Sequence, residues 1–344
     1  MLDAIKKELE GRRDYLANTI VETVYFGGGT PSLLNATELL ELWTVIEQNF
    51  QLSDNMEVTL EANPDDLTLE RLQDYKKHSP LNRLSIGIQS FHNADLEYMN
   101  RAHNAEEALQ CLENALAVGF QQLSIDFIYG TPTMTNTQWR ENLHTAFALG
   151  IPHISCYALT VEPKTALQHL IIKGKAEGVS EEHSAQQFEI LLTEIAKQGY
   201  EQYEISNFCK PPHYAKHNSA YWKGAHYLGV GPSAHSFNGT TRQWNIANNA
   251  QYMQGILSQQ PNFELETLTA KEQYNEYILT ALRTKWGAEL PYIKAQWGGG
   301  IAEHFQSKSV SYQAQGYMIK SADNFTLSDS GKLLADAIIS DLFW

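Results

Sequence analysis

Glycines and polar residues follow several apolar, strand-like segments of this 344-residue chain. The first cluster is Gly27-Gly28-Gly29-Thr30-Pro31, directly after Val21–Phe26. Consecutive glycines let a backbone approach a ligand without interference from Cβ atoms. Carbonyl groups of such a loop could accept hydrogen bonds from an ammonium group, and Thr30 adds a hydroxyl. The spacing is neither GxGxxG nor GxxxxGK[ST], so it indicates neither a dinucleotide fingerprint nor a P-loop.

Acidic and amide side chains stand at or near the ends of later strand-like segments. Glu61 and Asp126 could each hold ribose hydroxyls or an amino group, and Gln89 could bond a carboxylate or a base. In a parallel α/β barrel, ligands sit at the carboxyl ends of the strands, so these residues are expected to share one rim. For a single isolated acid, a capped helix or a satisfied buried carboxylate is the better explanation. The repetition at successive strand ends favours a ligand site.

A second candidate site lies in the segment His217-Asn218-Ser219-Ala220-Tyr221-Trp222. A neutral imidazole is a good ligand for a metal centre, and aromatic rings such as Tyr221 and Trp222 can cover the face of a flat ligand. The alternative for His217 is a hydrogen-bonded loop histidine. His213 and His217 could bind zinc if both lie on one helix, but no further spaced ligand supports that site.

The bulk composition is that of a globular protein with excess acid. The net charge of −15 repels phosphate backbones and argues against nucleic-acid binding. Cys111, Cys156 and Cys209 form no CxxC pair, so no cluster or zinc ligand set is visible, and so few cysteines fit a reducing cytoplasm. No apolar stretch approaches the ~20 residues that span a bilayer. Peripheral membrane contact and the oligomeric state stay open.

Strands and amphipathic helices are expected to alternate along most of the chain. The expected strands are Val21–Phe26, Met56–Glu61, Arg83–Ile88, Leu123–Ile128, His153–Ala158 and Glu201–Ile205. The expected helices are Ala36–Phe50, Leu67–His78, Ala105–Val118, Asn136–Leu149 and Ser180–Gln198. This alternation predicts a parallel sheet with outer helices, wound as βαβ units toward a partial α/β barrel. A doubly wound open sheet is the competing topology, and periodicity does not separate the two.

The chain opens with a helical pattern that leads directly into the first strand. Leu2, Ile5, Leu9 and Leu16 are spaced like one helix face. In an α/β domain such a helix normally follows an earlier strand. Either a first strand is missing, or a simple N-terminal helix packs on the outside.

The pattern changes from about residue 265, which predicts domains at 1–264 and 265–344. A helix at Thr269–Leu282 precedes a glycine-rich bend at Gly298-Gly299-Gly300. Two short strands, Tyr317–Ile319 and Asn324–Leu327, then precede a final helix from Ser330 to Leu342 that carries Leu333 and Leu334 on its apolar face. The second domain therefore resembles a winged-helix-like α+β module. Its acidic surface favours packing or substrate covering over DNA binding.

Together, several motifs closely resemble the HemW family, the haem-chaperone branch of the radical S-adenosylmethionine (SAM) proteins related to the oxygen-independent coproporphyrinogen III oxidase HemN. The motifs are Val24–Leu33, Glu61–Pro64, Leu84–Phe91, Met99–His103, Ile125–Gly130, Tyr203–Phe208, Asn275–Tyr277 and Leu282–Thr284. The HNxxYW sequence at His217 marks the haem-chaperone branch. The resemblance covers essentially the whole chain and implies a partial (β/α) barrel of the radical SAM type with a HemN-type C-terminal module.

The resemblance also implies ligands and partners. It implies that SAM is bound by Gly28, Gly29, Thr30, Glu61, Gln89, Arg101, Asp126 and Ala158, and haem by His217. The expected function is a cytoplasmic haem chaperone that delivers haem to acceptor proteins. The alternative is an oxidase that decarboxylates coproporphyrinogen III.

One family feature is absent. The CxxxCxxC motif, whose thiolates hold a [4Fe–4S] cluster, follows the first barrel strand in the family and would precede Met1 here. The resemblance therefore implies no cluster ligands within this chain. The absence of this motif agrees with a missing first strand. Either the start of the chain is assigned too late, or the chain is a shortened one. A third interpretation is a chain that binds neither cluster nor SAM productively.

Overall fold

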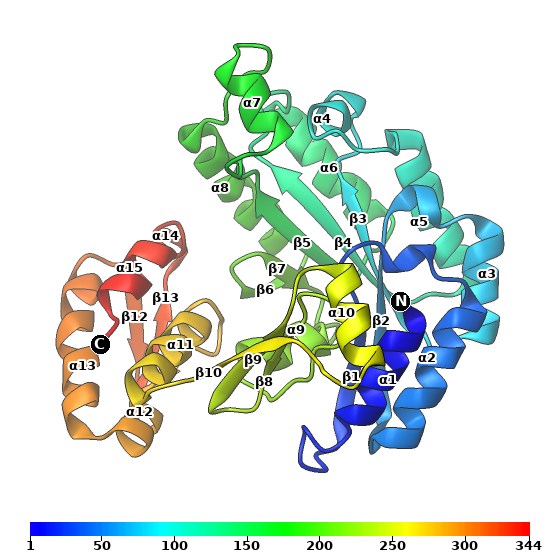
Figure 1. Cartoon of the computed structure of the whole chain (residues 1–344). Coiled ribbons are helices and arrows are strands. Elements are labelled where there is room, and N and C mark those ends of the chain that lie inside the picture. The colour runs from blue at the N-terminus through cyan, green and yellow to red at the C-terminus, as the bar shows by residue number, and fades with distance from the viewer.

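The larger part of the molecule is built on a curved seven-stranded sheet (Figure 1). The computed structural model describes residues 1–344. The strands lie in the order β1 (Val21–Phe26), β2 (Leu52–Ala62), β3 (Arg83–Gln89), β4 (Gln122–Tyr129), β5 (His153–Ala158), β7 (Asn207–Cys209) and β6 (Glu201–Glu204). Because β1 to β5 are parallel and adjacent in chain order, the sheet winds in one direction. This order confirms the partial barrel and excludes the doubly wound alternative. Only β7 runs antiparallel to its neighbours β5 and β6, and this strand was not predicted from the sequence.

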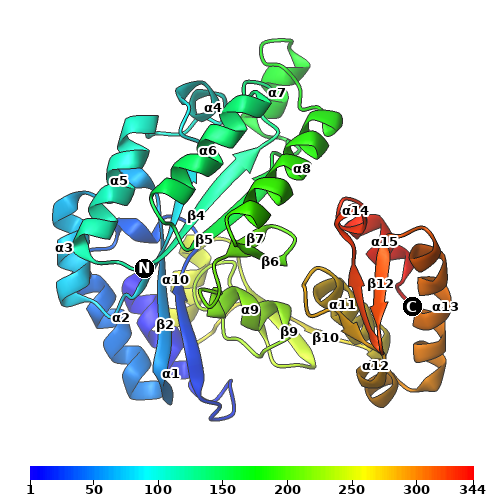
Figure 2. The same cartoon turned by 180° about the vertical axis from the view of Figure 1, so that it is seen from behind.

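The convex face of the sheet is covered by helices (Figure 2). They are α2 (Ala36–Asn49), α3 (Leu69–His78), α5 (Ala105–Val118), α6 (Asn136–Ala148) and α8 (Glu181–Lys197). Capping fixes where they begin: Asn35 forms a capping box with Glu38 at the start of α2. Thr68 caps α3 by accepting a hydrogen bond from the Arg71 backbone N–H, and Asn104 caps α5 by accepting hydrogen bonds from the backbone N–H groups of Glu106 and Glu107.

Side chains alternate across the sheet and give it one apolar and one polar face. Leu60, Leu84, Ile125 and Ile154 are fully buried in the core that the helices cover. Residues one position along each strand must point to the opposite, concave face. That face therefore carries the polar side chains, including Glu61 and Asp126, at the carboxyl ends of parallel strands.

The first helix, α1 (Leu2–Gly11), packs on the outside beside α2 and α10 (Asn249–Leu257). A buried carboxylate at Glu8 fixes it there. The carboxylate accepts hydrogen bonds from Gly231 N at 2.9 Å, Asn245 Nδ2 at 2.7 Å and the Tyr252 hydroxyl at 2.7 Å. Residues distant in sequence thus hold the N-terminal helix.

The segment that supplies these partners forms a small antiparallel sheet that was not predicted. Its strands are β8 (His235–Phe237), β9 (Thr241–Asn245) and β10 (Phe263–Thr267), in the order β10-β9-β8. The expected domain boundary at 264 lies inside β10.

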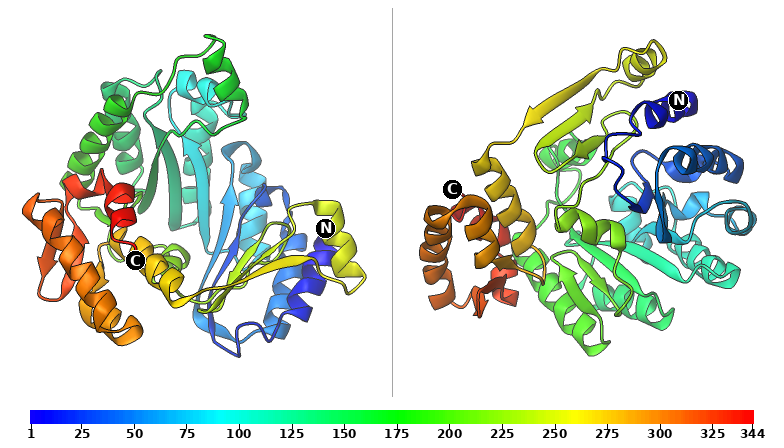
Figure 3. Two further views of the ribbon diagram at one scale, coloured as in Figure 1. Left: turned by 60° about the vertical axis from the view of Figure 1, so that its left-hand side comes forward. Right: turned by 90° about the horizontal axis from the view of Figure 1, so that it is seen from below.

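The C-terminal module has its own apolar core and lies at the flank of the main sheet (Figure 3). It consists of α11 (Ala270–Leu282), β11 (Ala288–Glu289), α12 (Leu290–Trp297), α13 (Gly299–Ala314), β12 (Met318–Ser321), β13 (Asn324–Leu327), α14 (Asp329–Lys332) and α15 (Ala335–Asp341). Helices around a small antiparallel sheet agree with the expected winged-helix-like arrangement.

Two details of the prediction for this module are wrong. The single final helix is broken into α14 and α15, and Leu333 and Leu334 at the break are exposed. The break occurs because Leu334 leaves the helical conformation, with φ −112° and ψ 17°. The glycine-rich bend is also smaller than expected. Gly298 alone makes the turn, with φ +91°, while Gly299 and Gly300 begin α13.

Candidate functional site

The loop Gly27–Thr30 joins the end of β1 to the short helix η1 (Pro31–Leu33) at the rim of the sheet. Gly28 and Gly29 have φ of +72° and +64°, values that glycine adopts without strain. No atom lies within 4 Å of the position a Cβ would take on either residue, so the space beside the loop is open. Thr30 is exposed and makes no capping bond to η1, which leaves its hydroxyl available.

Glu61, at the end of β2, is hydrogen-bonded to this loop. Its Oε2 accepts a hydrogen bond from the Gly28 backbone N–H at 3.1 Å, and its Oε1 accepts one from the Tyr25 hydroxyl at 2.7 Å. The two bonds hold the carboxylate in one orientation. Each oxygen keeps a free lone pair that can accept a further hydrogen bond from a ligand.

Gln89 and Arg101 meet over Gly87 on β3. A Cβ at Gly87 would lie 2.7 Å from Gln89 Nε2 and 3.3 Å from Arg101 Nη2, so glycine leaves the room that both side chains use. Gln89 has φ of +65°, which is uncommon for a residue other than glycine and is found at functional sites. Arg101 donates to Asn63 Oδ1 at 2.9 Å, just beyond β2.

Asp126 lies on β4 in register with Ser155 of β5. Burial raises the pKa of this carboxyl to about 7. A hydrogen bond with Ser155 lowers the pKa, the negative charge of Glu61 raises it further, and the positive charge of Arg101 lowers it. Glu61 and Arg101 thus lie close enough to Asp126 for their charges to affect its pKa.

Ala158 contributes differently from the other predicted residues. It ends β5, pairs with Tyr129 of β4 and is exposed. Its side chain has the parity of Ile154 and Cys156, which belong to the helix-covered core. The methyl group therefore points away from the concave face, and only the Ala158 backbone can contact a ligand held there.

Two tyrosines at the rim were not among the predicted site residues. Tyr25 is two residues before Gly27, and burial strongly raises the pKa of its hydroxyl, so it stays protonated and donates to Glu61. Tyr157 is two residues after Ser155 on the concave side of β5. Period-two alternation counted back from the glycine loop would have found Tyr25.

His217 lies in α9 (Lys216–Trp222), a short helix beside β1 (Figure 1). Its Nδ1 is 3.0 Å from the Thr23 hydroxyl, and its ring stacks on Tyr25 with centroids 4.6 Å apart and 19° between planes. Burial lowers the pKa of His217, which favours the neutral imidazole. No protein group bonds to Nε2, and that nitrogen is not among the buried polar atoms that lack a partner. It is therefore free to bind a metal centre.

Glu57 of β2 holds the start of α9 in place. Its carboxylate accepts hydrogen bonds from the backbone N–H groups of Lys216 at 3.0 Å and His217 at 2.9 Å. Arg83, which is only 2% exposed, lies 3.5 Å from the same carboxylate. A buried ion pair on the concave face thus positions the helix that carries His217.

The zinc alternative is contradicted by the structure. His213 precedes α9 rather than lying on it, and its Nδ1 is 3.3 Å from Gln122 Oε1. It therefore does not share a helix face with His217. No group of three or more histidine, cysteine or acidic side chains is arranged to hold a metal ion in residues 1–344.

The aromatic residues of the HNxxYW sequence follow one turn later on α9. Tyr221 is 48% exposed, and its ring contacts Trp222 edge-on at 5.5 Å and Tyr227 at 5.7 Å. Trp222 lies 5.7 Å from the Arg283 guanidinium. The helix therefore presents an exposed aromatic surface one turn beyond His217.

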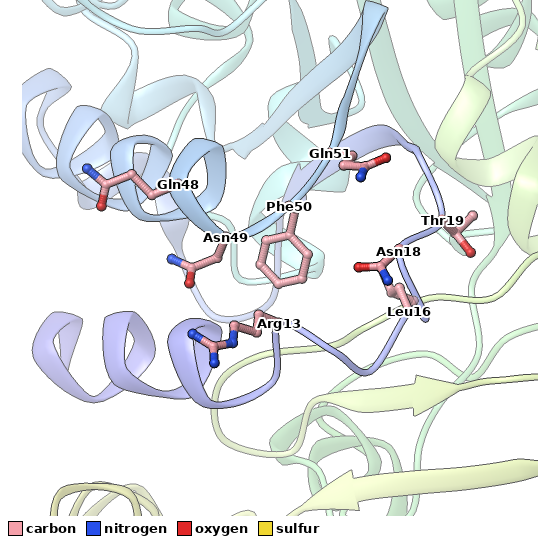
Figure 4. Close-up of a pocket in the computed structure, with 8 residues that line it drawn as sticks. All are labelled: Arg13, Leu16, Asn18, Thr19, Gln48, Asn49, Phe50 and Gln51. Atoms are coloured by element: carbon pink, nitrogen blue, oxygen red, sulfur yellow. The ribbon is translucent and has the colours of Figure 1, made fainter.

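A pocket of about 250 Å³ lies elsewhere, before the starts of β1 and β2 (Figure 4). It is lined by Arg13, Leu16, Asn18, Thr19, Gln48, Asn49, Phe50 and Gln51. These residues are at the amino ends of the strands, opposite the polar rim. The pocket is thus separate from the candidate site.

The singly wound sheet, with its polar rim beyond the carboxyl ends of the strands, defines a partial (β/α) barrel of the radical SAM type. Residues 3–146 match the Radical SAM superfamily. The structure resembles the coproporphyrinogen III oxidase HemN from Escherichia coli, with a TM-score of 0.84 over 99% of this chain and 82% of that chain at 23% identity.

Curated relatives narrow the class further. The chain is 32% identical to the heme chaperone HemW of Bacillus subtilis over 98% of its own length and 89% of the relative's. It is 32% identical to the heme chaperone HemW of Mycobacterium tuberculosis over 98% of its length and 85% of that protein's. The chain belongs to the HemW family of radical SAM proteins.

The family implies SAM and a [4Fe–4S] cluster, and the residues of this chain fit the two differently. The open loop, the free Thr30 hydroxyl and the carboxylates at the rim suit the amino and ribose groups of SAM. The three cysteines do not suit the cluster. Cys111, Cys156 and Cys209 are buried on α5, β5 and β7, and burial raises the pKa of each thiol, whereas cluster ligands are thiolates.

None of the helices combines the length and the apolar character that a membrane-spanning helix needs.

Proposed function

We propose that this chain is a haem chaperone that binds haem through His217 and delivers it to haem-accepting proteins. The observation that carries the proposal is the state of the His217 ring. The lowered pKa favours the neutral ring. In the tautomer with its proton on Nδ1, that N–H donates to the Thr23 hydroxyl, and the lone pair of Nε2 is free for a metal. A histidine held in this way by an outer hydrogen bond is suited to ligate iron. The names of the curated relatives support the same function.

The rim residues are proposed to bind SAM. In this assignment the loop at Gly28, Gly29 and Thr30 receives the methionine amino group, while Glu61 and Asp126 hold amino or ribose groups. Gln89 and Arg101 lie beside them over Gly87, and Ala158 contributes its backbone. In radical SAM proteins a bound cluster supplies the electron that cleaves SAM. The residues of this chain bind and orient the nucleotide, and no cluster-dependent step is assigned to them.

A transfer experiment tests the chaperone function. The chain is loaded with ferric haem, separated from free haem, and mixed with apomyoglobin as a generic acceptor whose Soret band is distinct. The expected result is a first-order shift of the Soret band to that of myoglobin, with a stable spectrum when no acceptor is added. A bound haem that stays on the chain in the presence of excess acceptor would argue against delivery.

The second candidate function is the oxidative decarboxylation of coproporphyrinogen III. The alternative is raised by the likeness in fold to the coproporphyrinogen III oxidase HemN. A version of the chain that carries the family's CxxxCxxC segment is reconstituted with the cluster and incubated anaerobically with SAM, a reductant and coproporphyrinogen III. The porphyrins are then separated after oxidation. Turnover to protoporphyrinogen would support the oxidase and overturn a function limited to haem delivery.

The proposed compartment is the cytoplasm. Its support is the presence of three buried cysteines with no disulfide between them, as is usual in a reducing environment.

A further inference from the structure

Tyr25 touches both proposed ligand sites. One face of its ring stacks on His217, with centroids 4.6 Å apart, and its hydroxyl donates to Glu61 Oε1 at 2.7 Å. The other oxygen of that carboxylate accepts the Gly28 backbone N–H at 3.1 Å. A single side chain thus links the candidate haem ligand to the glycine loop through one carboxylate.

The surroundings leave Tyr25 little freedom to move independently. A Cβ at Gly27 would lie 2.6 Å from one Tyr25 ring carbon and 3.2 Å from Glu61 Cδ. The ring is therefore packed against the backbone of the loop as well as against His217. If one of two stacked rings moves alone, the favourable contact between them is lost. A shift of the imidazole is therefore expected to displace the Tyr25 ring and its hydroxyl.

Glu61 converts that displacement into a change at the loop. A hydrogen bond to a carboxylate is stronger than one between neutral groups and is sensitive to geometry. If the Tyr25 hydroxyl moves, the carboxylate must rotate or lose a donor. Its second oxygen holds Gly28, whose φ of +72° allows the peptide to follow.

We propose that Tyr25 is a positioning residue that couples the two sites, so that occupancy of His217 by a metalloporphyrin changes the conformation of the Gly27–Thr30 loop. The inference rests on the proposed function for the identity of the two ligands. The link from His217 through Tyr25 and Glu61 to Gly28 does not depend on the identity of either ligand. Because coupling between sites is reciprocal, a nucleotide at the loop must change the affinity of His217 for the porphyrin by the same factor.

The sequence offers a selective reporter of the loop. Only four glycines in the chain follow another glycine, namely Gly28, Gly29, Gly299 and Gly300. Labelling glycine with ¹⁵N and with ¹³C at the carbonyl therefore leaves these four amides in an HNCO spectrum. Gly299 and Gly300 lie in α13 of the C-terminal module and serve as internal controls. Gly300→Ala removes only the Gly300 signal, and Gly299→Ala removes the signals of both Gly299 and Gly300, because the Gly300 amide follows the Gly299 carbonyl. Of the two signals that remain, Gly29→Ala removes that of Gly29 and so identifies that of Gly28. A Cβ at any of these three positions meets no atom within 4 Å.

The test compares the ligand-free protein with Tyr25→Phe and His217→Ala. Tyr25→Phe keeps the ring and removes only the bond to Glu61, and it is expected to move the Gly28 signal. His217→Ala removes the stacking partner and is expected to move the same signal. Tyr98→Phe, which removes a hydroxyl bonded to Glu177 O at 2.6 Å, is the matched control and should move none of the four. A Gly28 signal unaffected by His217→Ala would overturn the link, even if Tyr25→Phe moves it.

The second arm adds gallium(III) protoporphyrin IX, a diamagnetic analogue of haem. In the wild type it is expected to shift Gly28 and leave Gly299 and Gly300 in place. In Tyr25→Phe the shift at Gly28 should fall to less than about half, while the porphyrin absorbance shows that binding persists. An equal shift in both proteins would overturn the coupling. If the porphyrin does not bind the wild type, the proposed haem function fails, and the ligand-free spectra alone decide whether the link exists.

Discussion

At the scale of single residues, the environment of Asp126 has a direct consequence for stability. Burial raises its pKa in the folded protein to about 7, well above the ordinary value of about 3.9 for an unfolded chain. Between these two pKa values the folded state binds more protons than the unfolded state. The free energy of unfolding therefore falls as pH rises from about 4 to about 7 on account of this group.

The substitution Asp126→Asn removes this titration. The variant is expected to melt at a higher temperature than the wild type at pH 8, where the wild-type carboxylate is ionised, and at nearly the same temperature at pH 5. Thermal unfolding followed by circular dichroism at both pH values measures the difference. An identical offset between the two proteins at pH 5 and pH 8 would show that Asp126 does not titrate in this range.

The contact between Thr23 and His217 predicts an effect on haem affinity. Thr23→Val keeps the shape of the side chain and removes the hydroxyl 3.0 Å from Nδ1. The ring then loses the hydrogen-bond partner that orients it, so haem affinity should fall about 10- to 100-fold. Absorbance titration with haem measures this. Thr44→Val, which removes a hydroxyl bonded to Leu40 O on α2, is the control and should leave the affinity unchanged.

At the scale of elements, α9 depends on one buried ion pair. Glu57 accepts hydrogen bonds from the first two N–H groups of the helix and lies beside the Arg83 guanidinium. Glu57→Ala leaves a buried arginine without its partner, which is expected to cost about 3–5 kcal/mol of unfolding free energy. Urea denaturation measures the loss. Glu57→Gln should cost less because the amide oxygen still accepts one bond, and equal costs for the two variants would contradict this explanation.

Elements with strong periodicity could be predicted from the sequence, and short ones could not. The bounds of α2, α5 and α8 were expected within one residue because each has an apolar stripe and a clear capping residue. The helix α9 was missed because seven residues are too few to show a period and Ala215 provides no side-chain cap. The strand β10 was missed because it is exposed along its whole length and carries no alternating burial. The strand β8 was missed because three residues are too few to show a period.

Some residues of the candidate site could likewise be predicted from the sequence, and others could not. Glycines and acids at strand ends could be found from residue type and position, because a parallel sheet brings its carboxyl ends together. Tyr25 could be found only through the alternation that places it on the face of Glu61. The stacking of Tyr25 on His217 depends on a contact across 192 positions of sequence, which no local pattern encodes.

At the scale of the whole molecule, a short seam joins the barrel to the C-terminal module. Ile205 N donates to Arg283 O at 3.1 Å, and Lys285 N donates to Tyr203 O at 3.1 Å. Arg283 also lies 3.6 Å from the buried Glu204 carboxylate and 2.7 Å from Asp336. The two motifs around Tyr203 and Arg283, which the family resemblance singled out, thus serve to attach one unit to the other.

The seam predicts how the two units unfold. Arg283→Ala leaves the Glu204 carboxylate without its cation, and the coupling between the two cores should weaken. Differential scanning calorimetry is expected to show one transition for the wild type and two resolved or broadened transitions for the variant. Lys308→Ala removes a cation paired only with Asp341 inside the module and is the matched control. A single unbroadened transition for Arg283→Ala would show that the seam is held by other contacts.

Haem binding through His217 is tested most directly by a haem titration of the wild type, His217→Ala and His213→Ala, followed at the Soret band. If His217 holds haem, the wild type shows a saturable Soret shift and His213→Ala shows the same shift. His217→Ala is expected to lose at least about 10-fold in affinity and to show a changed band position. A Soret shift and affinity in His217→Ala equal to those of the wild type would contradict the claim that this chain holds haem through His217.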